Sequence, residues 1–370
     1  MKKINLFILV LLTLSILCSC ADTQVLSTTA AVDAAVNRAD GMLTVSYIDV
    51  GQADSILITT PDNKNMLIDA GEGEGYNGAV LSYLKEAGIT SLDTVIATHP
   101  HSDHISAMDE VLNAMTVTNF YMPNVSHTTK DFENMLNALE KVPNIFPAKE
   151  GINFNPGNKV NCEILSPVSD SYRGLNDYSI VLKLSYGNTA FLFTGDAENL
   201  VEKQILDKGK NIKANVLKCG HHGSSTSTSS EFINAVNPEY AVLSYDKNND
   251  YGHPHKEVID RLNKNKITIL ETEKSDTITF KSDGQRVTLV NSHNKTNTDS
   301  YTELTTITAV QTQATTQEEK IYEIYIGNKN SKKYHTIKCN SLPAQKNRVL
   351  FNSKEQAQEQ GYTPCKSCNK

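Results

Sequence analysis

The segment Thr98-His99-Pro100-His101-Ser102-Asp103-His104 places three histidines and one aspartate within six residues. Imidazole nitrogens and carboxylate oxygens are groups that bind zinc, at about 2.0–2.2 Å. On an extended segment His99 and His101 point to the same side, and Asp103 and His104, after a turn, can face a second ion. A polar loop with scattered histidines is the alternative. We favour a metal site, because four ligand-type residues at this spacing form a recognisable motif.

The segment follows the apolar run Leu92–Ala97, which is typical of a buried strand. Chemistry in α/β proteins tends to lie at the carboxyl ends of strands. Four other stretches also bring an aspartate or histidine to the end of a predicted strand or to the loop after it: Met66–Gly71, Phe191–Asp196, Gly220–Ser224 and Tyr251–Pro254. Taken singly, such an aspartate is more often a helix cap and such a histidine more often structural. Together they predict one metal-binding face.

The first twenty residues are typical of a secretion signal. Lys2 and Lys3 precede the apolar run Ile4–Leu17, which is short for a membrane span. The ending Leu17-Cys18-Ser19-Cys20 resembles the lipobox of bacterial lipoproteins, which implies cleavage before Cys20 and lipid on its thiol. An ordinary secretory signal is the alternative. We expect a lipoprotein signal peptide over 1–20, a tether over 21–40, and a protein anchored on the extracellular face of the cell membrane.

The main body alternates strand and helix patterns. Two successive β-rich halves predict stacked sheets with helices outside, an α/β four-layer sandwich over residues 42–292. One of its helices is expected over Phe132–Val142, with Asp131 as a possible N-cap. Residues 293–320 are rich in Ser and Thr with few large apolar groups, which predicts a linker. Residues 321–370 regain apolar and aromatic residues and predict a separate small module.

The motifs of the main body resemble the metallo-β-lactamase superfamily of hydrolases. The resemblance is carried by these segments: Tyr47–Ser55, Asn176–Leu182, Thr194–Asp196, His221–Ser224 and Tyr251–Pro254. These segments are especially similar to the hydrolase domain of the ComEC DNA-uptake competence proteins, and the similarity covers about residues 42–292. The many membrane spans of those proteins have no counterpart, since no later stretch approaches about 20 apolar residues. We expect a mature chain without a transmembrane helix, and a monomer.

This resemblance implies a centre of two divalent ions, Zn or Mn. The implied ligands are His99 and His101 for the first ion, Asp103 and His104 for the second, Asp196 as a bridge, and His222 to complete the set. Asp69 is expected to orient the first loop. Asn176-Asp177 stands where the superfamily has a third histidine motif. The last ligand of the first ion is therefore left open between His222 and His253.

The implied chemistry is hydrolysis by a metal-activated hydroxide. The catalytic candidates are Asp103, His253 and His221, and either of the two histidines would donate a hydrogen bond or proton to the developing charge. Asn176 and Ser224 are expected beside the ligands. Ser224 would bind a phosphate, and a purely solubilising role for its loop is the alternative.

The tail pairs His335-x3-Cys339 with Cys365-x2-Cys368, a ligand set that suits a structural zinc. It resembles the metal-binding module of the Ada DNA-repair protein, as do Tyr334-His335 and Gly361–Cys365. A disulfide with one unpaired thiol is the alternative. The chain has a net charge of −7, yet residues 321–370 hold nine Lys or Arg against three Glu, which favours an anionic partner for the tail.

These features predict an extracellular, lipid-anchored, metal-dependent hydrolase. The leading function is a phosphodiesterase or nuclease acting on DNA. One alternative is a phosphodiesterase acting on teichoic acid or phosphocholine decorations of the envelope. Another is a lipoprotein that binds DNA or an anionic polymer and hydrolyses it only incidentally.

Overall fold

The computed structural model describes residues 41–291 and 324–370, except 338, 345–346, 352 and 369–370. The predicted signal peptide, the lipidation site Cys20, the tether and the linker over 293–320 lie outside the described residues. Among the residues that are described, no helix is long and apolar enough to cross a membrane.

The first sheet has eight strands. Their order is β15 (Val287–Asn291), β14 (Ile278–Ser282), β1 (Leu43–Tyr47), β2 (Ile56–Thr59), β3 (Asn65–Ile68), β4 (Ser91–Ile96), β5 (Thr116–Pro123) and β6 (Asn144–Ala148). Strands β3 to β6 run parallel. Parallel neighbours need crossover connections, which contain α2 (Ala79–Glu86), α3 (Ser102–Ile105), α4 (Met108–Ala114), α5 (Lys130–Ala138) and the 3₁₀ turn η1 (Leu139–Lys141).

The second sheet has seven strands. Their order is β13 (Thr268–Glu271), β12 (Tyr240–Leu243), β11 (Val216–Lys218), β10 (Thr189–Phe193), β9 (Val181–Tyr186), β8 (Val160–Ser166) and β7 (Asn153–Gly157). Strands β10 to β13 are parallel. The segments between them contain α6 (Asn199–Asp207), α7 (Ser230–Val236), α8 (Lys256–Lys264) and the 3₁₀ turn η3 (Gly220–Gly223); η2 (Asn176–Tyr178) precedes β9 and α9 (Thr272–Ser275) follows β13.

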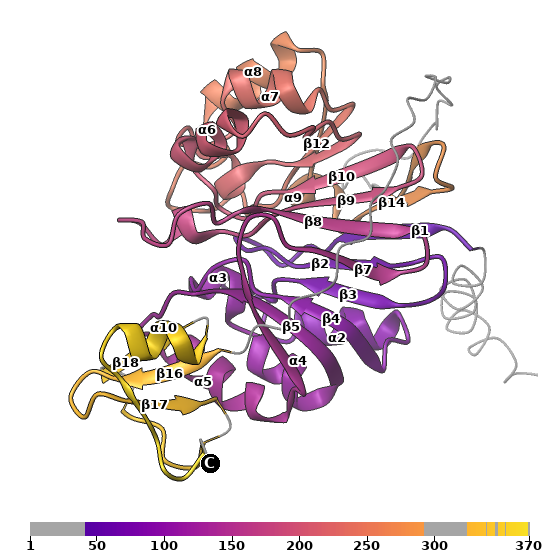
Figure 1. Ribbon diagram of the computed structural model, residues 1–370. Helices are drawn as coiled ribbons and strands as arrows, with labels where there is room; N and C mark the ends of the chain where they lie inside the picture. Colours follow the sequence, from indigo (N-terminus) through magenta and orange to yellow (C-terminus); the bar gives the residue numbers. More distant parts are fainter. Residues whose placement is uncertain (1–40, 292–323, 338, 345–346, 352, 369–370) are drawn as a thin grey trace, which may run out of the picture.

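A shared core joins the two sheets. The rings of Tyr47, Phe191, Phe193 and Phe280 contact one another between them, and each side chain is almost fully buried. Burying one such ring contributes roughly 1.5–3 kcal/mol. Helices α2, α4 and α5 cover one outer face, and α6, α7 and α8 cover the other (Figure 1). The predicted four-layer sandwich is confirmed.

Two strands from the end of the domain join the first sheet. β14 and β15 come late in the chain but pair into the first sheet, with Phe280 opposite Val45 on β1. Strands β3 and β4 are parallel in the first sheet, and β10, β11 and β12 are parallel in the second. The loops that follow these strands begin at their carboxyl ends. Each of the five predicted ligand segments either includes one of these ends or lies in the loop that follows it.

The tail forms a four-stranded sheet with one helix. Its parts are β16 (Tyr325–Asn328), β17 (Lys333–Thr336), β18 (Arg348–Phe351), α10 (Lys354–Glu359) and β19 (Thr363–Pro364). Ile326 and Leu350 belong to the same buried cluster as Phe132 and Met135 of α5. The module therefore packs on the outer helices of the first sheet (Figure 1).

Candidate metal centre

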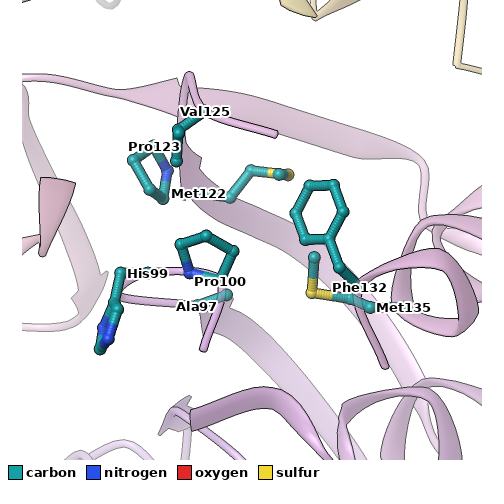
Figure 2. Close-up of a pocket in the computed structure, with 8 residues that line it drawn as sticks. All are labelled: Ala97, His99, Pro100, Met122, Pro123, Val125, Phe132 and Met135. Carbon is teal, nitrogen blue, oxygen red and sulfur yellow. The ribbon is translucent and has the colours of Figure 1, made fainter. Parts of the chain in front are cut away.

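The loop between β4 and α3 carries the His-x-His-x-Asp-His motif. His99 Nε2 lies 3.0 Å from His101 Nδ1, so these two rings converge. Their loop rests on an apolar pocket, and Figure 2 shows His99 at one end of it. The pocket is lined by Ala97, His99 and Pro100, by Met122, Pro123 and Val125 at the end of β5, and by Phe132 and Met135 of α5.

Asp69, which directly follows β3, binds the loop that carries the histidine motif. Its carboxylate accepts hydrogen bonds from the Thr98 backbone N–H and from the Thr98 hydroxyl, both at 2.7 Å. It also contacts His104 Nδ1 at 2.8 Å. A carboxylate on Nδ1 favours the tautomer that leaves the Nε2 lone pair of His104 for an ion. This is the orienting contact that the sequence predicts for Asp69.

Asp196, after β10, lies among four histidines. Its Oδ1 is 3.2 Å from His104 Nε2 and 3.6 Å from His222 Nε2. Its Oδ2 is 3.8 Å from His99 Nε2 and 3.7 Å from His221 Nε2. The carboxylate is 1% exposed. It therefore lies at the centre of the cluster, where a bridging role is predicted.

His222 is anchored from the opposite side. Its Nδ1 contacts the Ser244 carbonyl at 2.9 Å, and its Nε2 lies 3.3 Å from Asp103 Oδ2. Asp103, His104, Asp196 and His222 thus offer ligand atoms within 4.8 Å of one another, and so do His99, His101 and Asp196. The two groups share Asp196. All six predicted ligands are brought together.

The electrostatics of the centre favour positive charge. Burial alone would lower the pKa of His104, but Asp196 and Asp69 raise it well above the ordinary value. Burial opposes ionisation of Asp196, yet His104 and His222 hold the pKa of its carboxyl well below the usual range. Burial, followed by His104, lowers the pKa of His99. Asp196 is thus ionised and His99 is neutral at pH 7, as metal ligands must be, whereas His104 would release a proton when an ion binds.

Several polar atoms in the centre are unsatisfied by protein groups. Among the described residues, Asp54 Oδ1, His104 Nε2, Asp196 Oδ1 and His222 Nε2 are buried without a hydrogen-bond partner. His104 Nε2 and Asp196 Oδ1 are close, but not in hydrogen-bonding geometry. Leaving such groups unpaired costs about 1–3 kcal/mol each. Converging, unpaired nitrogen and oxygen atoms fit divalent metal, which satisfies them together.

A buried ion pair behind the centre is not predictable from the motifs. Lys218, the last residue of β11, is fully buried, and its Nζ lies 2.8 Å from Asp54 Oδ2. Burial lowers the pKa of this lysine, but Asp54 raises it overall. Asp54 also lies 3.6 Å from His222 Nδ1. The only signal in the sequence is a lysine at the end of an otherwise apolar strand.

The two catalytic histidine candidates lie at the rim. His253 Nδ1 is 3.5 Å from the Gln52 side-chain nitrogen, and its ring lies 5.4 Å from that of His221. Burial, followed by His222 and His221, lowers the pKa of His253 to about 4. His253 is therefore neutral at pH 7. Gln52, which positions it, is a site residue that the sequence reasoning missed.

The remaining predicted neighbours lie around His221. Asn176 Nδ2 is 3.4 Å from both ring nitrogens of His221. Ser224 donates its backbone N–H to the His221 carbonyl, and its hydroxyl lies 3.0 Å from that of Thr226. His127, not singled out by the sequence, lies with its ring 5.9 Å from that of His101. A phosphate-binding role for Ser224 stays a prediction.

The tail gathers its four predicted ligands. His335, Cys339, Cys365 and Cys368 offer ligand atoms within 4.8 Å of one another. His335 Nδ1 lies 3.3 Å from Cys339 Sγ. Cys339 and Cys365 carry thiols rather than a disulfide. One histidine and three cysteines suit a structural divalent ion.

A four-layer α/β sandwich with this convergent His/Asp cluster defines a metal-dependent hydrolase. The chain belongs to the metallo-beta-lactamase superfamily, whose family model matches residues 48–246. A second model, the metal binding domain of Ada, matches residues 308–370. The predicted resemblance to both families is confirmed.

Relatives of the chain include competence proteins. It is 32% identical to ComE operon protein 3 of Bacillus subtilis over 254 residues, which cover 64% of this chain and 33% of that protein. It is 31% identical to competence protein ComA of Neisseria gonorrhoeae, over 64% of this chain and 32% of that one. The chain thus spans about a third of the length of these relatives.

Solved structures of similar proteins are more distant. The metallo-beta-lactamase fold protein YhfI of Bacillus subtilis is 14% identical, with a TM-score of 0.43 over 65% of this chain and 100% of that one. The diiron β-hydroxylase CmlA of Streptomyces venezuelae is 13% identical, with a TM-score of 0.44 over 64% of this chain and 53% of that one.

Proposed function

We propose that this protein is a phosphodiesterase with a two-metal centre, that it cleaves DNA, and that it is held outside the cell by lipid on Cys20. The observation that carries the catalytic part is the position of Asp196, whose two carboxylate oxygens each face two histidines. Such a carboxylate suits two neighbouring ions. When bound, divalent ions supply Lewis acidity toward a phosphoryl oxygen and lower the pKa of water.

The residues of the chain would act by holding groups in place. Asp69 and Ser244 fix the rings of His104 and His222 through their Nδ1 atoms. His253, neutral and held by Gln52, would donate a hydrogen bond to an oxygen of the substrate phosphate. Asp103, His221 and the rim loop of Ser224 would complete the walls in which the phosphodiester is oriented.

The choice of DNA rests on the relatives and on charge. One relative is named a competence protein, another is ComE operon protein 3, and a third, recombination protein 2 of Haemophilus influenzae, is 30% identical over 62% of this chain. The surplus of basic residues in 321–370 adds a region suited to a polyanion. In the alternative of an envelope polymer, the same centre would cleave a phosphocholine or teichoic acid diester.

Metal-dependent turnover tests the proposal. We expect the purified protein, loaded with Mn²⁺ or Zn²⁺, to cleave single-stranded DNA about a thousandfold faster than its Asp196→Asn variant. A phosphocholine ester serves as the second substrate in a parallel assay. Cleavage of the ester alone would favour the envelope alternative. DNA that binds without being cut would favour a binding protein. Two bound ions with neither substrate cleaved would contradict the proposal of a phosphodiesterase.

The membrane anchor is tested separately. The proposal rests on the lipobox-like ending at Cys20 and on the tether that follows it. Lipid chains add about 0.8 kcal/mol of membrane affinity per buried CH₂. We expect the native protein to sediment with membranes and Cys20→Ala to appear in the soluble fraction, as measured by immunoblot. Membrane association that survives the substitution would contradict lipidation.

A further inference from the structure

The two oxygens of Asp196 divide the surrounding histidines into two sets. Oδ1 faces the Nε2 atoms of His104 and His222, at 3.2 and 3.6 Å. Oδ2 faces the Nε2 atoms of His99 and His221, at 3.8 and 3.7 Å. A carboxylate can bridge two ions with one oxygen on each. In that arrangement His104 and His222 would share one ion, and His99 and His221 would share the other.

The set of ligands around Oδ1, which would hold the second ion, is complete without His221. Asp103, His104, Asp196 and His222 supply four ligand atoms in one cluster. His222 is committed to it, because its Nε2 lies between Asp103 Oδ2, at 3.3 Å, and Asp196 Oδ1. The first set has His99, His101 and Asp196. It has no third histidine from the region of Asn176-Asp177, so a nitrogen from elsewhere is needed to match the superfamily's pattern.

The backbone of η3 directs His221 and His222 to different sides of Asp196. Both residues have left-handed conformations, with φ of 49° and 53°. Consecutive non-glycine residues in this region are costly and persist where the surrounding structure enforces them. The His221 N–H donates to the Gly195 carbonyl at 3.1 Å, and the His221 carbonyl accepts from Ser224. This turn lets adjacent histidines reach opposite oxygens of one carboxylate.

Two side chains orient the His221 ring. Glu198 Oε1 lies 3.4 Å from its Nδ1 and is itself held by the Thr226 hydroxyl at 3.1 Å. A carboxylate beside Nδ1 favours the tautomer with its proton there and leaves the Nε2 lone pair for an ion. Asn176, at the position of the missing histidine motif, places its amide nitrogen 3.4 Å from both nitrogens of the same ring. Asn176 therefore contacts His221, and its contact with Nε2 would be given up when an ion binds there.

We infer that His221 supplies the third nitrogen ligand of the first ion, in place of the missing histidine. This inference deepens the proposed function and rests on its two-metal centre. His253 is the weaker candidate: its Nδ1 contacts Gln52, and no ion pair within 4.0 Å joins it to Asp196 among the described residues. The histidine left open by the sequence is then neither His222 nor His253.

Metal content tests the assignment without any substrate. We compare His221→Asn, His253→Asn and, as a matched control, His255→Asn, each loaded with Zn²⁺ and dialysed. Asparagine tolerates the left-handed backbone at residue 221. We expect three ions per chain in the native protein and in the variants at 253 and 255, two in the centre and one in the tail, but only two in His221→Asn, measured by mass spectrometry of the metal. The centre ion that remains in His221→Asn shows that the other set is still folded.

Cobalt substitution adds a second readout. Visible absorption of bound Co²⁺ reports the number of nitrogen ligands, so His221→Asn should change the spectrum while His255→Asn leaves it as in the native protein. An unchanged ion count with a native spectrum in His221→Asn, an ion lost from His253→Asn, or a native centre that holds a single ion would each overturn the inference. Two ions in the centre with no phosphodiester cleavage would overturn only the proposed function.

Discussion

Replacing Asp196 by asparagine is expected to remove at least one bound metal ion and to lower kcat/KM by about a thousandfold, roughly 4 kcal/mol. The carboxylate has an acceptor oxygen on each side, and two histidines face each of them. An amide keeps only one oxygen, and its NH₂ group cannot bind metal. Whichever histidine pair faces the NH₂ group loses its shared ligand. Metal content and turnover on DNA, measured on the same sample, check this result.

The matched control is Asp207→Asn. Asp207 is an exposed carboxylate at the end of α6, paired with Lys203 at 2.7 Å. Such a surface pair contributes about 0–1 kcal/mol. This variant should keep both ions of the centre and native turnover. A variant at Asp196 that retained both ions of the centre and turnover within a few-fold of the native protein would remove the bridging role.

The predictable part of the fold was the part with local signals. The apolar run Leu92–Ala97 before the histidine motif corresponds to β4, and the helix expected over Phe132–Val142 overlaps α5. The strands β5, β6 and β7 have no clear strand pattern in the sequence. Their sequences contain Asn, Pro or Gly, which are depleted in strands. β6 and β7 are edge strands, where proline is tolerated. Their position in the sheets therefore explains why these proline-containing segments form strands.

The N-cap of α5 could not be predicted from residue spacing, because two residues near the start of the helix are of types that cap helices. Asp131 was expected as its N-cap, and this was wrong. The cap is Thr129, whose hydroxyl accepts from the Phe132 N–H. Asp131 lies in the first helical turn and accepts a 2.5 Å hydrogen bond from the Ser102 hydroxyl at the start of α3. Both residue types cap helices, and the tertiary contact with Ser102 decides between them.

The candidate site was predictable as a set of residues but not as a geometry. The motifs name the six ligand candidates, because residue type and strand ends are visible in sequence. They do not show which carboxylate oxygen each histidine faces. That depends on the left-handed turn at His221 and His222, and on Asn176, which arrives from a distant part of the chain. The ion pair of Lys218 cannot be predicted for the same reason, since its partner Asp54 lies far away in the sequence, in the loop between β1 and β2 of the other sheet.

Replacing Gly71 by alanine is expected to disrupt the second ligand set, although Gly71 binds nothing itself. A Cβ on Gly71 would lie 1.7 Å from the Asp103 carbonyl oxygen and 2.8 Å from the His104 nitrogen. These are backbone atoms, so no side chain can rotate away. The Asp103 oxygen also accepts from the Asp54 N–H, and the Gly71 N–H donates to the Asp54 carbonyl. The added methyl group must therefore push apart the loops that carry Asp54 and Asp103.

The expected size of this effect follows from the precision that the centre requires. Overpacking costs about 1–3 kcal/mol and occasionally more, and displacing a catalytic group by about 1 Å can cost roughly a hundredfold in rate. We expect Gly71→Ala to unfold at a lower temperature, to lose an ion, and to fall about a hundredfold in kcat. Gly174→Ala is the control, since its Cβ would approach no atom closer than Asp177 Oδ2 at 3.9 Å. Equal unfolding temperatures and metal contents in the two variants would mean that the loops yield to the methyl group, and that the close contact at Gly71 does not position Asp103 and His104.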